Sequence, residues 1–268
     1  MANILINNAF LGEMIGAALP AKLRFGGLAK VDNTLVGQPG DTIKVEKYAY
    51  MGAAEKVEEG KAIPVGDLTM TSQSVTLAKA GKGFKLTDEE IQRRGNEVVN
   101  EGKNQLTMSI ADKIDDDSYA ALKTTKLKYN CATSIKFQEI LKAKALFQSE
   151  NDGEKFALYI HPDQEADIIL DPGFMPSSKL NDSYVVEGAI GRIAGCDVIK
   201  SLKVKKVANK YHDVIVRESA LGIKLGKSVG IEDARDASVQ TTTWYGSEVY
   251  VVYLAKDNGA VELVTTEA

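Results

Sequence analysis

The feature that most constrains this chain is a pair of alternating segments joined by a stretch that cannot form a core. Apolar Ile43 and Val45 alternate with polar residues, and residues 74–79 repeat the same period of two. Such alternation predicts two strands, here the arms of a long hairpin. The intervening residues 51–61 are rich in glycine and charge. Because a two-stranded ribbon is marginally stable alone in water, this hairpin needs another surface to lie on.

A long helix is expected directly after the hairpin. Thr87 can cap a helix start, and Glu90 can reach back to complete a capping box. Apolar residues then recur at helical spacing to about residue 124, which places them on one stripe. Gly95 and Gly102 weaken this helix and allow a bend. The stripe comprises Ile91, Val98, Val99, Leu106, Ile110, Ile114 and Leu122.

The remainder of the chain predicts an α+β fold. Residues 2–30 are typical of an arm with one short helix. Helices are expected over 135–147 and between Pro162 and Asp171. Strands are expected at 156–160, 184–186, 197–199, 214–216 and 248–254.

Charge and hydropathy exclude several classes of protein. The formal net charge is −4 and the pI about 5.4, which disfavours a surface built to neutralise phosphates. DNA near this protein would therefore be a non-specific neighbour. No apolar run reaches the roughly 18 residues of a membrane span, and the N-terminus lacks a signal peptide. We expect synthesis and folding in a cytoplasm and no contact with membranes.

No motif predicts catalysis, a metal or a cofactor. Cys131 and Cys196 form no C-x-x-C pair, and there are only two histidines. The sequence His161-Pro162-Asp163 is better explained by a structural histidine near a helix start than by a catalytic dyad. The acidic run 112–117 lacks the spacing of a calcium loop, so we interpret it as a solvated or subunit-facing helix end. Glycines 188, 191 and 195 do not match a dinucleotide fingerprint, and Gly81-Lys82-Gly83 suits close packing.

The charged residues of the hairpin tip are candidate contacts with a neighbouring subunit. Charges on a protruding tip are placed to meet complementary charges on a partner. These candidates are Glu55, Lys56, Glu58, Glu59 and Lys61.

Three segments and the order of elements resemble the major capsid protein of tailed bacteriophages, which has the Hong Kong 97-type fold. The hairpin-to-helix passage is similar in Asp41-Thr42-Ile43-Lys44-Val45 followed by Thr87-Asp88-Glu89-Glu90. The central module resembles the family over 186–198, and the late strand over 243–250. The order of elements carries more of this resemblance than any one motif.

The resemblance implies a division of the chain and a function. The expected parts are an N-terminal arm (1–30), an extended β-hairpin loop (31–86), a spine helix of a peripheral module (87–124), an axial α+β module (125–222) and return strands of the peripheral module (223–268). The subunit would form hexamers and pentamers of an icosahedral phage head around double-stranded DNA, with each hairpin lying across a neighbour. A portal and a separate scaffolding protein are implied partners, the latter because no helical extension precedes the arm.

Two alternatives and one modification stay open. The same fold would suit an encapsulin-like compartment that holds an enzyme. A soluble α+β enzyme or binding protein would use the 125–222 module, although no convergent set of polar residues marks a pocket there. Some relatives join subunits by a lysine–asparagine isopeptide bond, for which Lys56 or Lys61 and Asn258 could be considered. We assign no crosslink.

Overall fold

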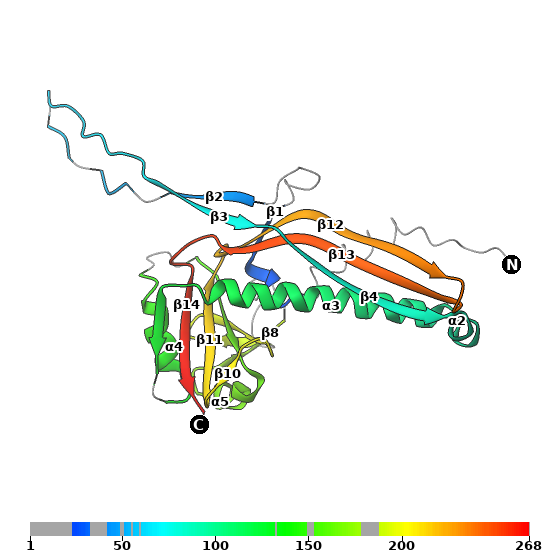
Figure 1. The fold of residues 1–268 in the computed structure, drawn as a ribbon. Helices are drawn as coiled ribbons and strands as arrows, with labels where there is room; N and C mark the ends of the chain where they lie inside the picture. Colours follow the sequence, from blue (N-terminus) through cyan, green and yellow to red (C-terminus); the bar gives the residue numbers. More distant parts are fainter. Residues whose placement is uncertain are drawn as a thin grey trace.

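The computed structural model describes residues 23–32, 42–48, 51–54, 56–58, 60–131, 133–148, 153–177 and 188–267. The molecule is elongated: a compact end holds the C-terminus, and a long helix and sheet extend away from it (Figure 1). A thin ribbon leaves the body in the opposite direction. Residues 2–22 of the arm expected over 2–30, the strand expected at 184–186, Glu55 and Glu59 lie outside the described residues.

The predicted hairpin is present as the ribbon, the antiparallel pair β2 (Thr42–Tyr48) and β3 (Met70–Thr76). Its second strand begins earlier than predicted, and the predicted run 74–79 crosses the end of β3. Its register runs from Thr42 opposite Thr76 to Tyr48 opposite Met70. Alternate β2 residues turn toward the body, and Val45 is buried among them. Only Leu77 separates β3 from β4 (Ala78–Thr87), which carries the chain into a second sheet.

The expected long helix is present but divided. Thr87 Oγ1 accepts a hydrogen bond from the Glu90 backbone N–H, and Glu90 Oε2 accepts one from the Thr87 N–H, so the capping box is confirmed. The first helix, α2 (Asp88–Arg94), ends at Gly95, whose φ of +69° lies in the left-handed region that favours glycine. The second, α3 (Asn96–Leu122), runs the length of the body.

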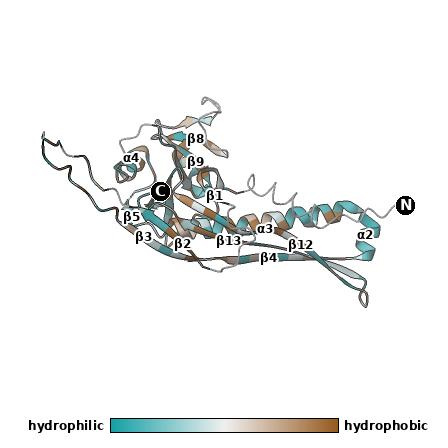
Figure 2. Cartoon of the chain, turned by 90° about the horizontal axis from the view of Figure 1, so that it is seen from above, coloured by the Kyte–Doolittle hydropathy of each residue, from teal (hydrophilic) through white to brown (hydrophobic). Residues whose placement is uncertain are grey.

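A four-stranded sheet lies along α3. Its order is β1 (Lys30–Asp32), β12 (Leu221–Asp236), β13 (Thr241–Leu254) and β4. The buried stripe of α3, including Leu106, Ile110 and Ile114, packs against Ile223 and Tyr250 of this sheet. Figure 2 shows brown apolar segments where α3 crosses the strands and a teal α2 beyond them. Burial of one helical stripe thus fixes the sheet on the helix.

The compact end is an eight-stranded mixed sheet, and the α+β class is confirmed. Helices α4 and α5 and β6, β9, β11 and β14 share one apolar cluster, whereas the last turns of α3 pack into another. The sheet order is β5-β14-β11-β6-β9-β8-β7, with β10 beside β11. The bounds are β5 (Leu127–Asn130), α4 (Phe137–Ala145), β6 (Phe156–Ile160), η2 (Pro162–Gln164), α5 (Glu165–Ile169), β7 (Met175–Pro176), β8 (Ala189–Ile193), β9 (Cys196–Lys200), β10 (Lys206–Val207), β11 (Lys210–Arg217) and β14 (Ala260–Thr266), with η1 (Gly26–Leu28) near the start.

One pairing departs from the expected division of the chain. Residues 223–268 were assigned to the peripheral module, but β14 pairs with β11 and β5 in the eight-stranded sheet. Its central residues, including Val261 and Leu263, are fully buried there. A strand apolar on both faces needs the middle of a sheet covered on both sides. The limits of the five parts remain a prediction.

Candidate assembly surface

The ribbon exposes apolar side chains that its own chain does not cover. Among the described residues between 51 and 69, every side chain is exposed, and Val65 is 93% exposed. Such a series of exposed apolar side chains on one projecting segment is a candidate interaction surface. The exposed apolar residues of the ribbon are Tyr48, Met51, Val57, Ile63, Val65, Leu68 and Met70.

The described tip residues predicted as contacts lie on this surface. Lys56, Glu58 and Lys61 are exposed, and Lys61 Nζ lies 2.7 Å from Glu58 Oε2. Both side chains of this pair are more than 70% exposed, so the pair contributes little stability to the subunit. Their contact with a neighbour stays a prediction, as does that of Glu55 and Glu59.

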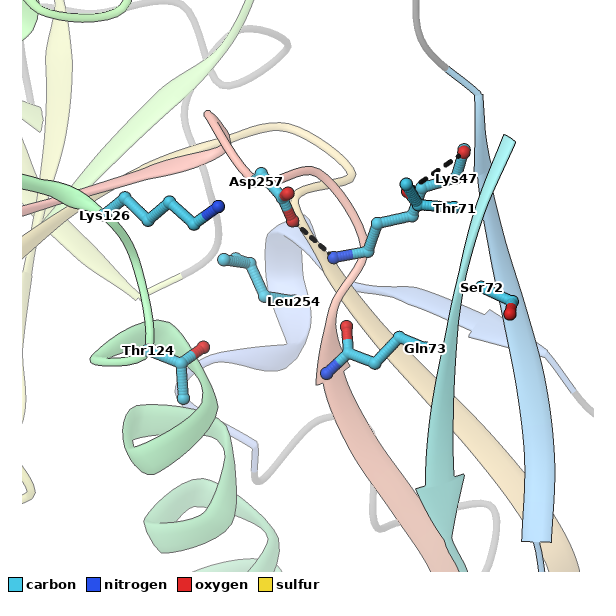
Figure 3. Close-up of a pocket in the computed structure, with 8 residues that line it drawn as sticks. All are labelled: Lys47, Thr71, Ser72, Gln73, Thr124, Lys126, Leu254 and Asp257. Atoms are coloured by element: carbon cyan, nitrogen blue, oxygen red, sulfur yellow. Dashed lines mark hydrogen bonds and ion pairs between the residues drawn. The ribbon is translucent and has the colours of Figure 1, made fainter. Parts of the chain in front are cut away.

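The base of the ribbon is fixed to the body by an ion pair. Lys47 Nζ lies 2.5 Å from Oδ1 of Asp257, a residue of the turn between β13 and β14. The Lys47 side chain is only 16% exposed. Beside this pair is a pocket of about 290 Å³ between the ribbon, the end of α3 and the start of β5 (Figure 3). It is lined by Lys47, Thr71, Ser72, Gln73, Thr124, Lys126, Leu254 and Asp257.

The interpretation of the acidic run as a solvated or subunit-facing helix end is wrong for one residue. Asp115 is only 3% exposed and accepts hydrogen bonds from the backbone N–H groups of Arg24 (3.0 Å) and Phe25 (3.2 Å). Burial raises the pKa of this carboxyl. Helical periodicity places Asp115 beside the buried stripe, where it anchors the chain at its first described residues. Asp112 and Asp116 are exposed and lie near Lys203.

The motifs considered for catalysis have structural roles. His161 Nδ1 accepts a hydrogen bond from the Asp163 backbone N–H, which confirms the histidine as a helix cap. Cys196 is fully buried, and burial raises the pKa of its thiol to about 12. Over the described ranges, no group of three histidine, cysteine or acidic residues could hold a metal ion. Nor does any described helix combine the length and apolar character of a membrane span.

The two glycines that flank Lys82 serve close packing, as expected. A Cβ atom on Gly83 would lie 2.9 Å from the Tyr245 ring and 3.0 Å from the Trp244 carbonyl oxygen. The absence of a side chain therefore lets β4 and β13 approach each other with Tyr245 folded across the strand. A phosphate-binding role is not needed to explain this motif.

Two charged centres were missed at the level of sequence. The first is the Lys47–Asp257 pair. Lys47 follows Ile43 and Val45 at the same spacing of two along the strand, and this alternation could have predicted that its side chain faces the body. The second is buried Glu262, whose carboxylate lies within ion-pair distance of Lys123, Lys128 and His212. Burial alone would raise the pKa of Glu262, but these partners hold it below its ordinary value. The pairing of the charges has no local sequence signal in either centre, because the partners lie far apart in the chain.

Comparison with known proteins identifies the architecture. A family model described as "Phage capsid protein" matches residues 70–263. The major capsid protein of Staphylococcus phage phiMR11 is 32% identical over 255 residues, covering 94% of this chain and 91% of the relative. The capsid of Ralstonia phage GP4 aligns with a TM-score of 0.74 at 10% identity, covering 90% of this chain and 87% of the other. A virus-like particle from Pyrococcus furiosus aligns at 0.60 and 14% identity, covering 94% and 98%.

These comparisons separate the fold from the family. The structural alignments, at 10% and 14% identity, show the fold alone. The family match over most of the chain, together with a relative at 32% identity, shows the family. The chain therefore belongs to the phage capsid protein family, with the Hong Kong 97-type fold, and is a structural protein of the virion, the major capsid protein of a tailed-phage head.

Proposed function

We propose that this capsid protein closes its shell by laying the ribbon of each subunit across the next subunit of a hexamer or pentamer, around double-stranded DNA. The observation that most supports this proposal is the series of exposed apolar side chains on the ribbon. Leaving these side chains in water is unfavourable, and burial recovers roughly 25 cal/mol for each Å² of apolar surface covered. A neighbouring copy supplies the missing surface.

The geometry of the ribbon favours a neighbouring subunit, rather than its own subunit, as the surface on which it packs. β2 and β3 pair only from 42 to 48 and from 70 to 76, and the described chain beyond them has exposed side chains throughout. Two paired strands alone form a marginal structure. Obligate interfaces between subunits commonly bury more than about 2,000 Å², and a long projecting arm is one way to reach that area.

The proposal includes partners other than the subunit. A scaffolding protein would guide curvature during assembly, and a portal would occupy one vertex. The packaged DNA would be a non-specific neighbour, in keeping with a net charge of −4. An encapsulin-like compartment is the second candidate, supported by the alignment with the Pyrococcus furiosus particle. Its shells would contain a co-expressed enzyme and exclude DNA.

Deletion of the ribbon tip tests the proposal. The variant lacks residues 52–62, whose described members are all exposed, so its subunit should unfold at the same temperature as the wild type. Negative-stain electron microscopy and size-exclusion chromatography, with and without a scaffolding protein, should show shells or capsomer rings for the wild type only. A matched control exchanges residues 52–62 for a glycine–serine segment of equal length.

The outcomes separate folding from assembly. Loss of shells with an unchanged unfolding temperature supports the proposal. Normal shells from the deletion variant would show that the tip is dispensable and would overturn the role given to it. The glycine–serine control then shows whether tip length or tip chemistry is required.

A further inference from the structure

The ribbon meets the body through a small contact. Of β2, Val45 is buried and Ile43 and Lys47 are partly covered, whereas Met70–Ser74 of β3 are all exposed. The chain passes from β3 into the four-stranded sheet through a single unpaired residue, Leu77. Hinges are a few residues at the ends of elements that absorb a change of direction. The base of the ribbon therefore has the form of a hinge with a limited packed surface.

The space beneath this hinge is a pocket and not a packed core. It has a volume of about 290 Å³ and is lined mainly by polar side chains from the ribbon, the end of α3 and the β13–β14 turn. Protein interiors are otherwise packed as densely as organic crystals. A change in the ribbon's angle here therefore displaces few buried side chains, of which Val45 of β2 is one.

Asp257 stands between two cations at the edge of this pocket. Lys47 binds it from the ribbon, and Lys126 reaches toward it from the opposite side, at the start of β5 (Figure 3). The hydrogen bond from Lys47 lowers the pKa of Asp257 most, and the charges of Lys47 and Lys126 lower it further. Lys126 thus acts on the carboxylate without being its bonded partner.

We propose that Asp257 is a latch with two alternative partners: it holds Lys47 in the unassembled subunit and exchanges Lys47 for Lys126 when a neighbour engages the ribbon. This inference rests on the proposed function, because it makes the ribbon angle respond to docking. The two ion pairs define two discrete states of the hinge. A neighbour that binds the released ribbon better shifts the population toward that state.

The energies suit such an exchange. The Asp257 side chain is 55% exposed, so water screens the pair at the carboxylate, and Lys47, 16% exposed in this state, regains water when the ribbon swings away. Breaking one pair while forming another of the same type costs little, so the contacts of a docking neighbour suffice to select the released state. A buried pair would lock the ribbon instead, because removing its partner would leave an unpaired charge in the interior.

Distance measurement in the isolated full-length subunit tests the latch. Nitroxide labels are placed at Met70→Cys on the ribbon and Asn130→Cys on β5, both exposed positions, in a Cys131→Ser background. Cys196 is fully buried and stays unlabelled. The Lys47→Met variant should show a longer, broader distance distribution, and Lys44→Met, on the opposite face of the same strand, should match the wild type.

Lysine acylation followed by mass spectrometry reports the partner exchange. In Lys47→Met, Lys126 should react roughly twofold to fivefold more slowly than in the wild type, because it now pairs with Asp257. Lys126→Met should leave the ribbon distance unchanged. The swap Lys47→Asp with Asp257→Lys should restore the wild-type distance, since Lys126 cannot pair with a lysine at 257.

Each outcome bears on the latch separately from the proposed function. An unchanged distance and unchanged Lys126 reactivity in Lys47→Met would overturn the latch while leaving ribbon docking intact. A shift in the Lys44→Met control of the same size would also overturn it, because general loss of charge would then explain the result. Normal shells from the tip deletion would instead overturn ribbon docking.

Discussion

Two buried carboxyls of this subunit, those of Asp213 and Glu248, have raised pKa values. Asp213 is fully buried, and its Oδ2 accepts hydrogen bonds from Gln164 Nε2 (3.0 Å) and Thr265 Oγ1 (3.0 Å), while Oδ1 has no partner. Burial raises the pKa of this carboxyl to about 7. Glu248 is similar: it is 1% exposed, and burial raises its pKa to about 7. Both groups favour folding in their protonated form.

We expect Asp213→Asn to stabilise the subunit at alkaline pH. The pKa of Asp213 in the folded state lies above its ordinary value of 3.8, so the folded subunit binds this proton more tightly than the unfolded chain does. The contribution of Asp213 to the free energy of unfolding is therefore fully present below about pH 4 and is lost as the pH rises through 7. The amide oxygen can accept the same two hydrogen bonds without a buried charge. Thermal unfolding should show a melting temperature several degrees above the wild type at pH 8, with a difference that shrinks toward pH 4.

The exposed carboxyl of Asp67 provides the control for this measurement. Asp67→Asn makes the same chemical change on the ribbon and should give no pH-dependent difference in melting temperature. If Asp213→Asn and Asp67→Asn behave alike across the pH range, the burial of Asp213 does not govern the pH dependence of folding.

At the scale of elements, the sequence predicted those features that residues close together in the chain determine. The alternation at 42–48 and the capping box at Thr87 were sufficient for the ribbon and the start of the helix. The partner strands of β14 were not predictable, because an apolar strand sequence does not indicate which sheet the strand joins. Asp115 was misjudged for a related reason: its burial depends on Arg24 and Phe25, about ninety residues away. Contacts distant in sequence leave no periodic signal.

Gly102 shows how packing reverses a propensity argument. In a helix interior, glycine to alanine normally gains about 1 kcal/mol. A Cβ atom at Gly102, however, would lie 2.4 Å from Cε2 of Phe84, whose ring is stacked on Trp244 at 5.1 Å between centroids. We therefore expect Gly102→Ala to destabilise the subunit by about 1–3 kcal/mol in urea unfolding.

The matched control is Asn104→Ala, an exposed position in the same helix. It carries the gain in helix propensity without the clash and should stabilise slightly. A stabilising Gly102→Ala would mean that Phe84 moves freely, and that the glycine does not hold α3 close to the sheet.

At the scale of the whole molecule, α3 joins two separate apolar clusters. Leu106, Ile110 and Ile114 pack with the four-stranded sheet, whereas Tyr119 and Leu122 pack in a cluster formed mainly by the eight-stranded sheet. Tyr119 also donates a hydrogen bond to the His212 carbonyl oxygen (2.9 Å) and accepts one from the Lys205 N–H (3.3 Å). One continuous helix therefore belongs to both cores, and loss of either core exposes apolar residues of α3.

This shared helix predicts that the isolated subunit unfolds in a single cooperative transition despite its two sheets. Trp244, the only tryptophan, lies in the four-stranded sheet, and Cys196 is fully buried in the cluster on the opposite face of the eight-stranded sheet from Tyr119 and Leu122. In a Cys131→Ser background, the urea midpoints of Trp244 fluorescence and Cys196 thiol reactivity should coincide. Leu122→Ala weakens the junction and should lower the Cys196 midpoint more than the Trp244 midpoint. Separate midpoints in the parent protein would instead make α3 a linker between two independent units, and docking forces on the ribbon would then not reach the compact end.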